Sequence, residues 1–260
     1  MIFIIPSDFF KTTKASGLID NMYKNGNFTH VFHPNNERMF ENASIDIMIF
    51  RYLKDPGEVK SCVFNDNVLN SKISNGILTF STDFSNCKRL GDFFDIKVGI
   101  VSGCDKVFKS ELGNTSVLTG ENTLQKYICY SEFPTNNNDV NKVLLDNKEL
   151  LMTRKIKKFT EKNWFQWGAL RNVSFVEENI GKPCIYIHNI SRKSKVAFIG
   201  VVGYFSGNLL MMLPKTEELD LKEVVDCLNS IEFKKNYIFS NRFKIGHKQL
   251  QESNFFLDKQ

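Results

Sequence analysis

The chain has 260 residues, which is long enough to bury a hydrophobic core as one large domain or one and a half ordinary ones. Hydrophobic residues make up 42% and charged residues 24%, the profile of a soluble globular protein, and the net charge of +5 is too small to name a partner by itself. The opening MIFIIPSDFF has only four apolar residues in a row before Pro6, with no basic segment and no cleavage site, so we expect neither a signal peptide nor a membrane span, and a cytoplasmic protein.

The first 55 residues predict an α/β fragment. Residues 2–5 form a short apolar run ended by Pro6, which favours a strand buried on both faces. Ser7 and Asp8 offer an N-cap for a helix to about Tyr23, closed by Asn25-Gly26. Strands are then expected at residues 28–33 and 45–53, with a helical turn at 37–40. Such a fragment leaves an unpaired apolar edge in a parallel sheet, so it needs neighbouring strands.

Asp55-Pro56-Gly57 interrupts this pattern and is the predicted domain boundary. Beyond it, strands are expected at residues 61–64, 77–81, 96–101 and 125–130, and then at 184–190, 196–204 and 209–213. The longest helical stretch is 139–158, and two further helices are expected at 219–230 and 231–239. The predicted fold class is therefore an α/β fragment, the end of a Rossmann-like sheet, followed by a mixed α+β domain.

Cysteine and histidine show no metal-binding pattern. The six cysteines are scattered singly, with no Cys-x-x-Cys pair, and are interpreted as small buried side chains in a reduced compartment. His30 and His33 would lie on opposite faces of a strand, so no metal site is expected. Phe occurs 24 times, so aromatic rings must fill much of the core, although an AT-rich coding sequence explains the count equally well.

Positive charge is concentrated in the middle of the chain. Residues 151–200 contain ten Lys or Arg against three acidic residues, a surplus of seven that exceeds the net charge of the whole chain. A concentrated basic stretch in an otherwise balanced protein is typical of a polyanion partner. A solvated basic surface with no partner is the alternative.

Several segments follow one another in a known order. Residues 4–9 read IIPSDF, residues 40–46 read FENASID before an apolar run, and residues 94–108 read FDIKVGIVSGCDKVF. Residues 164–172, 228–230 and 242–247 complete the set. Together they resemble the gamma-class (TaqI-like) adenine-N6 DNA methyltransferases of restriction–modification systems. The segment at 94–108 is the most specific, because it is similar to the signature that opens the target-recognition domain of that family.

The resemblance also shows what the sequence lacks. It implies that the complete enzyme uses S-adenosylmethionine, held by a Gly-rich loop, and an Asn-Pro-Pro-Tyr/Phe motif that grips an adenine flipped out of the duplex. Neither motif occurs here, and in the family both precede the IIPS-like strand. The chain thus resembles the back half of the enzyme, with no cofactor in this chain alone and no catalytic residue. A truncated gene, a split enzyme or a trimmed chain would each produce this pattern.

Two basic segments near the tryptophans are candidate DNA contacts. The TRKIKK run at 153–158 is predicted to place four cations at a helix end beside Trp167, where they would hold phosphates. These cations are Arg154, Lys155, Lys157 and Lys158. The alternative is a solvated helix terminus with Trp164 and Trp167 in the core. Arg171 and Asn172 are residue types that read guanine and adenine edges, and a structural role for Arg171 is nearly as plausible.

Two later segments complete the predicted interface. The link between the strands at 184–190 and 196–204 carries Arg192, Lys193 and Lys195, which would reach a phosphate backbone or form an ordinary soluble turn. Residues 242–248 alternate basic with apolar or small residues, so the cations share one face of an extended chain. The predicted contacts there are Arg242, Lys244, His247 and Lys248, against a packed C-terminal segment with exposed lysines.

The leading hypothesis follows from these observations. Residues 1–55 would complete the sheet of a methyltransferase domain, and residues 56–260 would form the target-recognition domain that binds double-stranded DNA. A polypeptide carrying the S-adenosylmethionine and Asn-Pro-Pro-Tyr motifs would be its partner. Two alternatives stay open: a complete small enzyme with an unrecognised cofactor site, and a non-catalytic specificity subunit that associates with a separate methyltransferase subunit.

Overall fold

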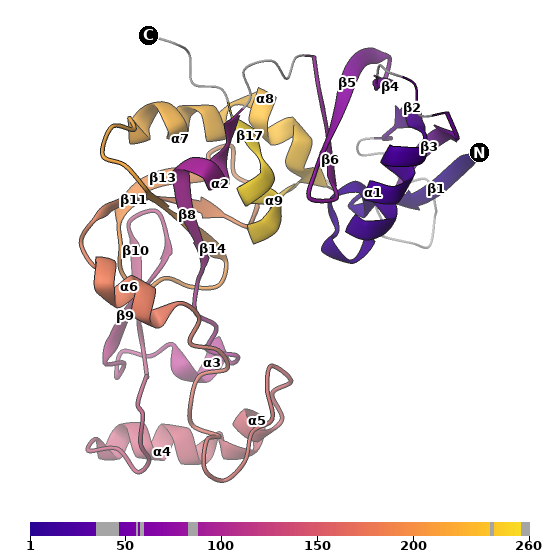
Figure 1. Ribbon diagram of the computed structural model, residues 1–260. Helices are drawn as coiled ribbons and strands as arrows, with labels where there is room; N and C mark the ends of the chain where they lie inside the picture. Colours follow the sequence, from indigo (N-terminus) through magenta and orange to yellow (C-terminus); the bar gives the residue numbers. More distant parts are fainter. Residues whose placement is uncertain (35–46, 56, 58–59, 83–87, 240–241, 256–260) are drawn as a thin grey trace. The chain divides into compact units, whose positions relative to one another are not determined.

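The computed structural model describes residues 1–34, 47–55, 57, 60–82, 88–239 and 242–255 (Figure 1). The chain forms two compact units, and it passes between them four times. Unit 1 comprises Met1–Phe94, Asn189–Ala197 and Pro214–Gln260, and unit 2 comprises Asp95–His188 and Phe198–Leu213. None of the helices in the described part of the chain is long and apolar enough to cross a lipid bilayer.

A six-stranded sheet with the order β1-β3-β2-β4-β5-β6 forms most of the N-terminal part of unit 1. Strand β3 is antiparallel to both of its neighbours, whereas β2 and β4 are parallel. Helix α1 (Ser16–Asn25) lies beside this sheet (Figure 1). The strands are β1 (Ile2–Pro6), β2 (Asn27–Phe32), β3 (Ile47–Leu53), β4 (Ser61–Phe64), β5 (Asn67–Ser74) and β6 (Ile77–Ser81).

Strand β1 forms where the sequence predicts it, but the prediction that both of its faces are buried is wrong. It is the edge strand of the sheet, and it leaves Ile2 and Ile4 71% and 62% exposed. This edge is apolar as expected, but the prediction of a parallel sheet is wrong here, because β3 pairs antiparallel with both β1 and β2. The next helix also differs: 3-10 turns at Phe9–Lys11 and Thr13–Ala15 precede α1, and Asp8 makes no side-chain cap.

Two short loops connect the strands of the β4-β5-β6 meander, and its middle strand was not predicted from the sequence. Asn65 and Asp66 have φ values of 41° and 68°, and Asn75 and Gly76 have φ values of 47° and 75°. Positive φ at both central residues is the signature of the tight turn that suits a hairpin, and it favours Asn, Asp and Gly. Strand β5 was missed because its polar residues hide the alternation that marks a strand.

Aromatic rings build the core of the sheet, as the Phe count predicts. Phe10 lies 5.0 Å from Phe28 and 5.3 Å from Phe50, measured between ring centres, and each of the three is almost fully buried. Phe80 contributes from β6, 5.7 Å from Phe10. These contacts join β2, β3 and β6, so the sheet continues across residue 55. The boundary predicted there concerns the domains of a complete enzyme and stays a prediction.

The remaining elements of unit 1 come from the end of its first part and from its two later parts. Strand β12 pairs with β16, and β16 with β15, while β17 pairs with β7. Glu252 of α9 accepts hydrogen bonds from Ser74 and from Asn75 (2.5 Å), which ties the C-terminal helix to the β5–β6 turn. The elements are β7 (Lys88–Arg89), α2 (Leu90–Phe93), β12 (Ile190–Ser191), α7 (Leu221–Asn229), α8 (Ile231–Lys234), β15 (Ile238–Phe239), β16 (Arg242–Lys244), α9 (His247–Glu252) and β17 (Asn254–Phe255).

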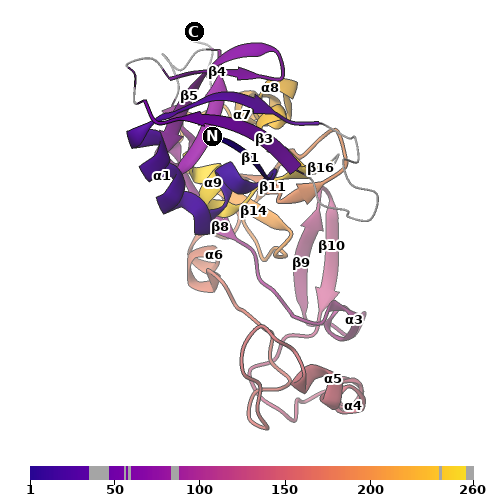
Figure 2. The ribbon, with the colours of Figure 1, turned by 90° about the vertical axis from the view of Figure 1, so that its right-hand side faces the viewer.

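Unit 2 contains a four-stranded sheet with the order β13-β11-β14-β8 and the separate hairpin β9–β10. Figure 2 shows the two strands of this hairpin side by side, with α3 at one end. The strands are β8 (Phe94–Val98), β9 (Thr115–Gly120), β10 (Thr123–Tyr127), β11 (Pro183–His188), β13 (Ala197–Val201) and β14 (Leu209–Pro214). The helices are α3 (Asp105–Phe108), α4 (Asn138–Asp146), α5 (Lys148–Met152) and α6 (Val173–Asn179).

The long helix predicted at 139–158 is shorter and broken. Helix α4 is capped by the Asn137 side chain, and α5 ends at Met152, so the cations at 154–158 lie beyond the helix in irregular chain. The predicted turn at 37–40, the FENASID segment and Pro56 lie outside the described residues.

Candidate nucleic-acid interface

Two predicted DNA-contacting segments, about 50 residues apart in the sequence, lie side by side in unit 1. Strand β12 pairs antiparallel with β16, so that Ile190 opposes Lys244 and Ser191 opposes Phe243. The pairing places Arg192, just after β12, next to Arg242 at the start of β16. We call the cations of this strand pair and its loop the basic ribbon: Arg192, Lys193, Lys195, Arg242 and Lys244.

The basic ribbon is turned toward solvent. Arg192, Lys193, Lys195 and Arg242 are exposed, and Lys244 is half-buried with its Nζ 3.5 Å from a carboxylate oxygen of Asp8. An exposed ion pair of this kind contributes little and breaks easily when an anion competes for the lysine. The two remaining predicted contacts of this segment, His247 and Lys248, begin α9 and are half-buried.

The loop between β12 and β13 is held in place by hydrogen bonds within the loop and with residues of α7 and α8. The backbone N–H of Lys193 donates to the Ser191 hydroxyl at 3.0 Å, and Lys234 of α8 donates to the carbonyl of Ser194 at 2.6 Å. At the end of the loop, the Asn229 side-chain oxygen accepts from the backbone of Val196 and Ala197. The loop therefore presents its cations from a supported backbone.

Arg154 of unit 2 faces the protein interior. Its guanidinium donates to the carbonyls of Leu151 (2.7 Å), Ser102 (2.9 Å) and Trp164. It also lies 3.8 Å from the centre of the Phe159 ring. Burial lowers its pKa from 12.5 to about 10. Since each of its three nitrogens donates to a backbone carbonyl, Arg154 supports a loop, which favours the structural interpretation over a phosphate contact.

The next three cations of the run behave differently. Lys155, Lys157 and Lys158 are exposed, and Lys157 lies 5.4 Å from the Phe159 ring. We call these three residues the lysine loop. They are the part of the TRKIKK run that remains available to a polyanion.

The other predicted DNA contacts of unit 2 divide in the same way. Trp167 is buried, and its indole N–H donates to the carbonyl of Ile128 at 2.7 Å, so it belongs to the core. Asn172 adopts a left-handed conformation (φ 57°) just before α6 and donates to the carbonyl of Val98 at 2.9 Å. Arg171 is exposed. The core alternative considered for the tryptophans thus fits the structure, while the DNA contacts of these residues stay predictions.

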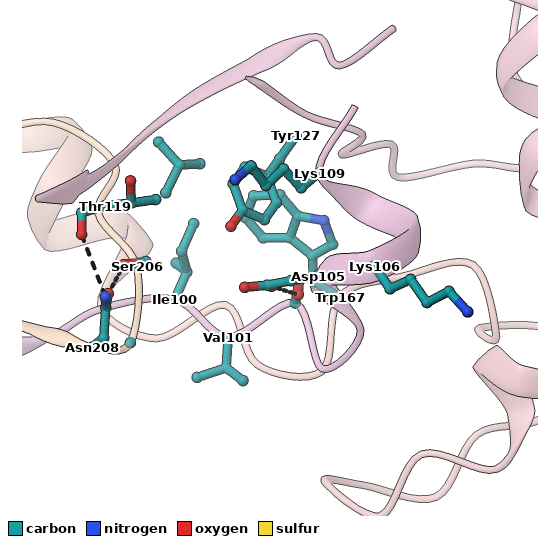
Figure 3. Close-up of a pocket in the computed structure, with 13 residues that line it drawn as sticks. Ile100, Val101, Asp105, Lys106, Lys109, Thr119, Tyr127, Trp167, Ser206 and Asn208 are labelled. Atoms are coloured by element: carbon teal, nitrogen blue, oxygen red, sulfur yellow. Dashed lines mark hydrogen bonds between the residues drawn. The ribbon is translucent and has the colours of Figure 1, made fainter. Parts of the chain in front are cut away.

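The segment at 99–108 lines a cavity of about 640 Å³ in unit 2 (Figure 3). Gly99 is needed because a Cβ there would lie 2.2 Å from the carbonyl oxygen of Ser206. Gly103 is needed because its φ is +82°, in the left-handed region. Gly99 therefore permits a close backbone approach, and Gly103 a tight turn.

Asp105 is the acidic residue of this cavity, and it was not among the predicted site residues. Its carboxylate accepts hydrogen bonds from the hydroxyls of Ser102 and Tyr127. Burial raises the pKa of Tyr127 to about 12, and the Asp105 charge and hydrogen bond add to the shift. Its signal in the sequence was its place in the most specific segment, at 94–108.

The structure holds no evident metal ligand set in its described part, where no three His, Cys, Asp or Glu side chains come together. The cysteines fit the small-hydrophobe interpretation in part. Cys62 and Cys184 are buried, whereas Cys104, Cys129 and Cys227 are half-buried. Burial raises the pKa of the Cys62 thiol to about 12, which keeps it unreactive.

Comparisons with known proteins agree with these observations. No family model matches the chain. The Type II methyltransferase M.HindII from Haemophilus influenzae is 26% identical over 270 residues, covering 76% of this chain and 51% of that protein. The Type II methyltransferase M.MjaIV from Methanocaldococcus jannaschii is 30% identical over 132 residues, covering 50% of this chain and 42% of that protein. The chain therefore spans about half the length of these curated relatives.

One solved structure shares the fold. The Type IIL restriction-modification enzyme MmeI, solved in complex with DNA, aligns with 96% of this chain and 38% of its own, at a TM-score of 0.55 and 10% identity. The chain is thus a mixed α/β protein with a six-stranded sheet, similar in fold to a restriction–modification enzyme. The resemblance to restriction–modification methyltransferases is confirmed at this level. The gamma class and the assignment to the C-terminal part stay predictions.

Proposed function

We propose that this chain recognises and binds DNA as part of a site-specific adenine-N6 DNA methyltransferase of a restriction–modification system. The observation that carries the proposal is the pairing of β12 with β16, which joins two separately predicted basic segments into one exposed surface. Cations so arranged neutralise phosphates and release counterions, the main source of affinity for duplex DNA. The similarity to two Type II methyltransferases supports the same reading.

In this proposal, residues 1–55 belong to a methyltransferase sheet, and the rest of that sheet comes from a partner segment or polypeptide. One face of β1-β3-β2 supports this. Ile4, Ile49 and Phe32 stand opposite one another across the three strands and therefore share a face. Ile4 and Phe32 are 62% and 49% exposed. An apolar patch on a sheet beside an open edge strand is typical of a surface that another element covers.

The cofactor of the complete enzyme would be S-adenosylmethionine, bound outside this chain. It would supply the methyl group, while this chain would hold the DNA in register. The sequence has no Gly-rich loop and no Asn-Pro-Pro-aromatic motif, so we assign none of its residues to the cofactor or to the target adenine. Tight binding of S-adenosylmethionine to the isolated chain in a calorimeter would contradict this division and favour a complete small enzyme.

Fluorescence anisotropy with a labelled DNA duplex tests the DNA-binding part. We expect the affinity to fall steeply with salt between about 50 and 200 mM. The salt slope, the slope of the logarithm of the affinity against the logarithm of the salt concentration, should become shallower by about one for each phosphate contact removed. Changing Arg192→Gln together with Arg242→Gln should lower the slope by about two. Changing the exposed Lys14→Gln together with Lys222→Gln should leave it unaltered. An affinity independent of salt would overturn the proposal.

The partner is tested separately. Ile4→Lys should abolish co-purification with a polypeptide that carries the Asn-Pro-Pro-Tyr motif and is encoded next to this chain. Thermal stability should change little, because Ile4 is exposed. Val68→Lys is the matched control, because Val68 is 71% exposed on another strand of the same sheet. Unchanged association of the Ile4 variant would mean that this face is not the docking surface. A partner without the cofactor motifs would instead favour a separate specificity subunit.

A further inference from the structure

The cavity in unit 2 ends in a carboxylate with a defined orientation. One oxygen of Asp105 accepts a hydrogen bond from the Ser102 hydroxyl. The other oxygen faces the space between Ile100 and Tyr127 (Figure 3). The Ser102 hydroxyl also accepts from the backbone N–H of Cys104, at 3.2 Å, and it is fixed by that bond. The carboxylate is therefore held in place by the loop, before any ligand enters.

The carboxylate at this end of the cavity favours a ligand group that donates a hydrogen bond. The Tyr127 hydroxyl donates a hydrogen bond to Asp105, and an ionised carboxylate only accepts hydrogen bonds. A carboxylate repels phosphate oxygens and carbonyl oxygens, and it attracts an amino group. On the edge of a DNA base pair in the major groove, the donors are the N6 amino group of adenine and the N4 amino group of cytosine.

The rest of the cavity fits the edge of a base. Ile100 and Val117 are buried apolar side chains of its wall, and they keep water from solvating a bound edge. At the other end the side-chain amide of Asn208 donates to the carbonyl of Thr119 at 3.3 Å, and its oxygen accepts from Ser206. Lys106 and Lys109 are exposed at the rim, where they can meet the phosphates on either side of a base.

We propose that Asp105 is a specificity-determining residue that accepts a hydrogen bond from the exocyclic amino group of an adenine or cytosine in the recognised sequence. The proposal rests on the DNA-binding function above and adds which base chemistry unit 2 selects. A thymine or guanine at the same position would present a carbonyl oxygen to the carboxylate and would be rejected.

Selection from a random-sequence duplex pool by the full chain tests the proposal. The unmodified chain should enrich sequences with adenine or cytosine at one fixed position. Asp105→Leu keeps roughly the size of the side chain but removes its acceptor, so it should no longer select adenine or cytosine at that position. Asp146→Leu, at the end of α4 and exposed, is the matched control and should enrich the same sequences as the unmodified chain.

Base analogues identify the amino group itself. In the selected duplex, cytosine is replaced by 2-pyrimidinone, or adenine by purine, so that only the amino group is lost. The unmodified chain should lose about tenfold in affinity, the scale of one hydrogen bond to a charged group. The Asp105→Leu variant should lose less than twofold, because its side chain has no acceptor for that group.

The outcomes separate this proposal from the wider one. If binding is salt-dependent but the Asp105→Leu variant enriches the same base at every position, Asp105 reads no base and the inference is overturned while DNA binding stands. Enrichment of no fixed position by the unmodified chain would overturn it as well. If neither protein binds DNA, the proposed function itself fails. Thermal melting of both variants, expected within about 2 °C of the unmodified chain, shows that any change in selection does not come from unfolding.

Discussion

At the scale of single residues, two neighbours of the same charge have opposite surroundings. Arg154 donates to three backbone carbonyls and stacks on Phe159, whereas Lys155 is exposed. One of those carbonyls belongs to Ser102, which orients Asp105. Arg154 therefore acts on the cavity through the loop that it supports, and Lys155 is available to DNA.

Replacing Arg154 should lower stability more than it lowers phosphate binding. Arg154→Met leaves three carbonyls without their donor and should reduce the free energy of unfolding of unit 2 by about 3 kcal/mol. Arg154→Lys should recover only part of this loss of stability, since an ammonium cannot donate to three carbonyls in the geometry of a guanidinium. Both tryptophans lie in unit 2, so their fluorescence in a urea titration reports this unfolding. Lys155→Met is the control and should change stability by less than about 0.5 kcal/mol. If Arg154→Met lowered the free energy of unfolding by no more than Lys155→Met does, the buried role of Arg154 would be contradicted.

Lys11 should make the stability of unit 1 depend on pH near neutrality. Burial lowers its pKa from 10.5 to about 7, while its Nζ lies 4.6 Å from the Tyr237 ring centre. Between these two values the unfolded chain binds more protons than the folded one, so stability rises with pH from about 7 to 10.5. Below pH 7 the full cost of charging the folded lysine is present.

Lys11→Met removes that cost. Its melting temperature at pH 6 should exceed that of the unmodified chain by roughly 2–4 °C, the shift that about 1 kcal/mol produces in a protein of this size. The difference should shrink at pH 9. Melting followed by circular dichroism at both pH values measures it, with the exposed Lys14→Met as the control. An equal difference at both pH values would show that lost packing, and not protonation, is responsible.

At the scale of elements, the sheet of unit 1 depends on its tight turns. Gly76 has a φ of +75°, and a Cβ there would lie 2.4 Å from the Cβ of Ser16 at the start of α1. The β5–β6 turn thus packs directly against α1, and it needs a residue without a side chain.

Gly76→Ala should lower the stability of unit 1 by about 2 kcal/mol, from the strained left-handed conformation and the collision with Ser16. Gly17→Ala is the opposite case within α1. Nothing lies within 4 Å of its added Cβ, and alanine should raise stability by about 0.5 kcal/mol because it favours the helix. Hydrogen exchange of the β5 and β6 amides measures both. Equal protection in the two variants would exclude a role for this turn in holding the sheet.

The elements also show where sequence reasoning succeeds and where it stops. Strands β4 and β6 begin and end where their apolar residues predict. Strand β5 was missed because its only fully buried side chain is the polar Ser71, although Asn75-Gly76 was a strong turn signal. The helix predicted at 139–158 was too long because hydrophobic periodicity does not take the contacts of Arg154 into account. Arg154 lies beyond the end of the helix and donates hydrogen bonds to carbonyls that are distant in sequence.

At the scale of the whole molecule, the predicted contacts fall on both units. The lysine loop belongs to unit 2 and the basic ribbon to unit 1. Composition identified both, since charge density needs no tertiary information. The pairing of β12 with β16 was not predictable, because it joins residues 190–191 to residues 243–244 across two helices. The role of Asp105 was hidden for a similar reason: its partner Tyr127 comes from the far end of a hairpin that was predicted only in part.

The two clusters can be tested for joint action on one duplex. A ribbon variant (Arg192→Gln, Lys193→Gln and Arg242→Gln) and a loop variant (Lys155→Gln, Lys157→Gln and Lys158→Gln) each remove three exposed cations. If one duplex touches both units, each variant should lower the salt slope by up to about three and their combination by up to about six, because counterion release adds over phosphate contacts. Anisotropy titrations over a range of salt concentrations measure the slopes, with the exposed Lys14, Lys142 and Lys222 changed to Gln as the control. A combined variant with the slope of the ribbon variant alone would mean that the lysine loop makes no contact with DNA, and that unit 2 meets the duplex only through its cavity.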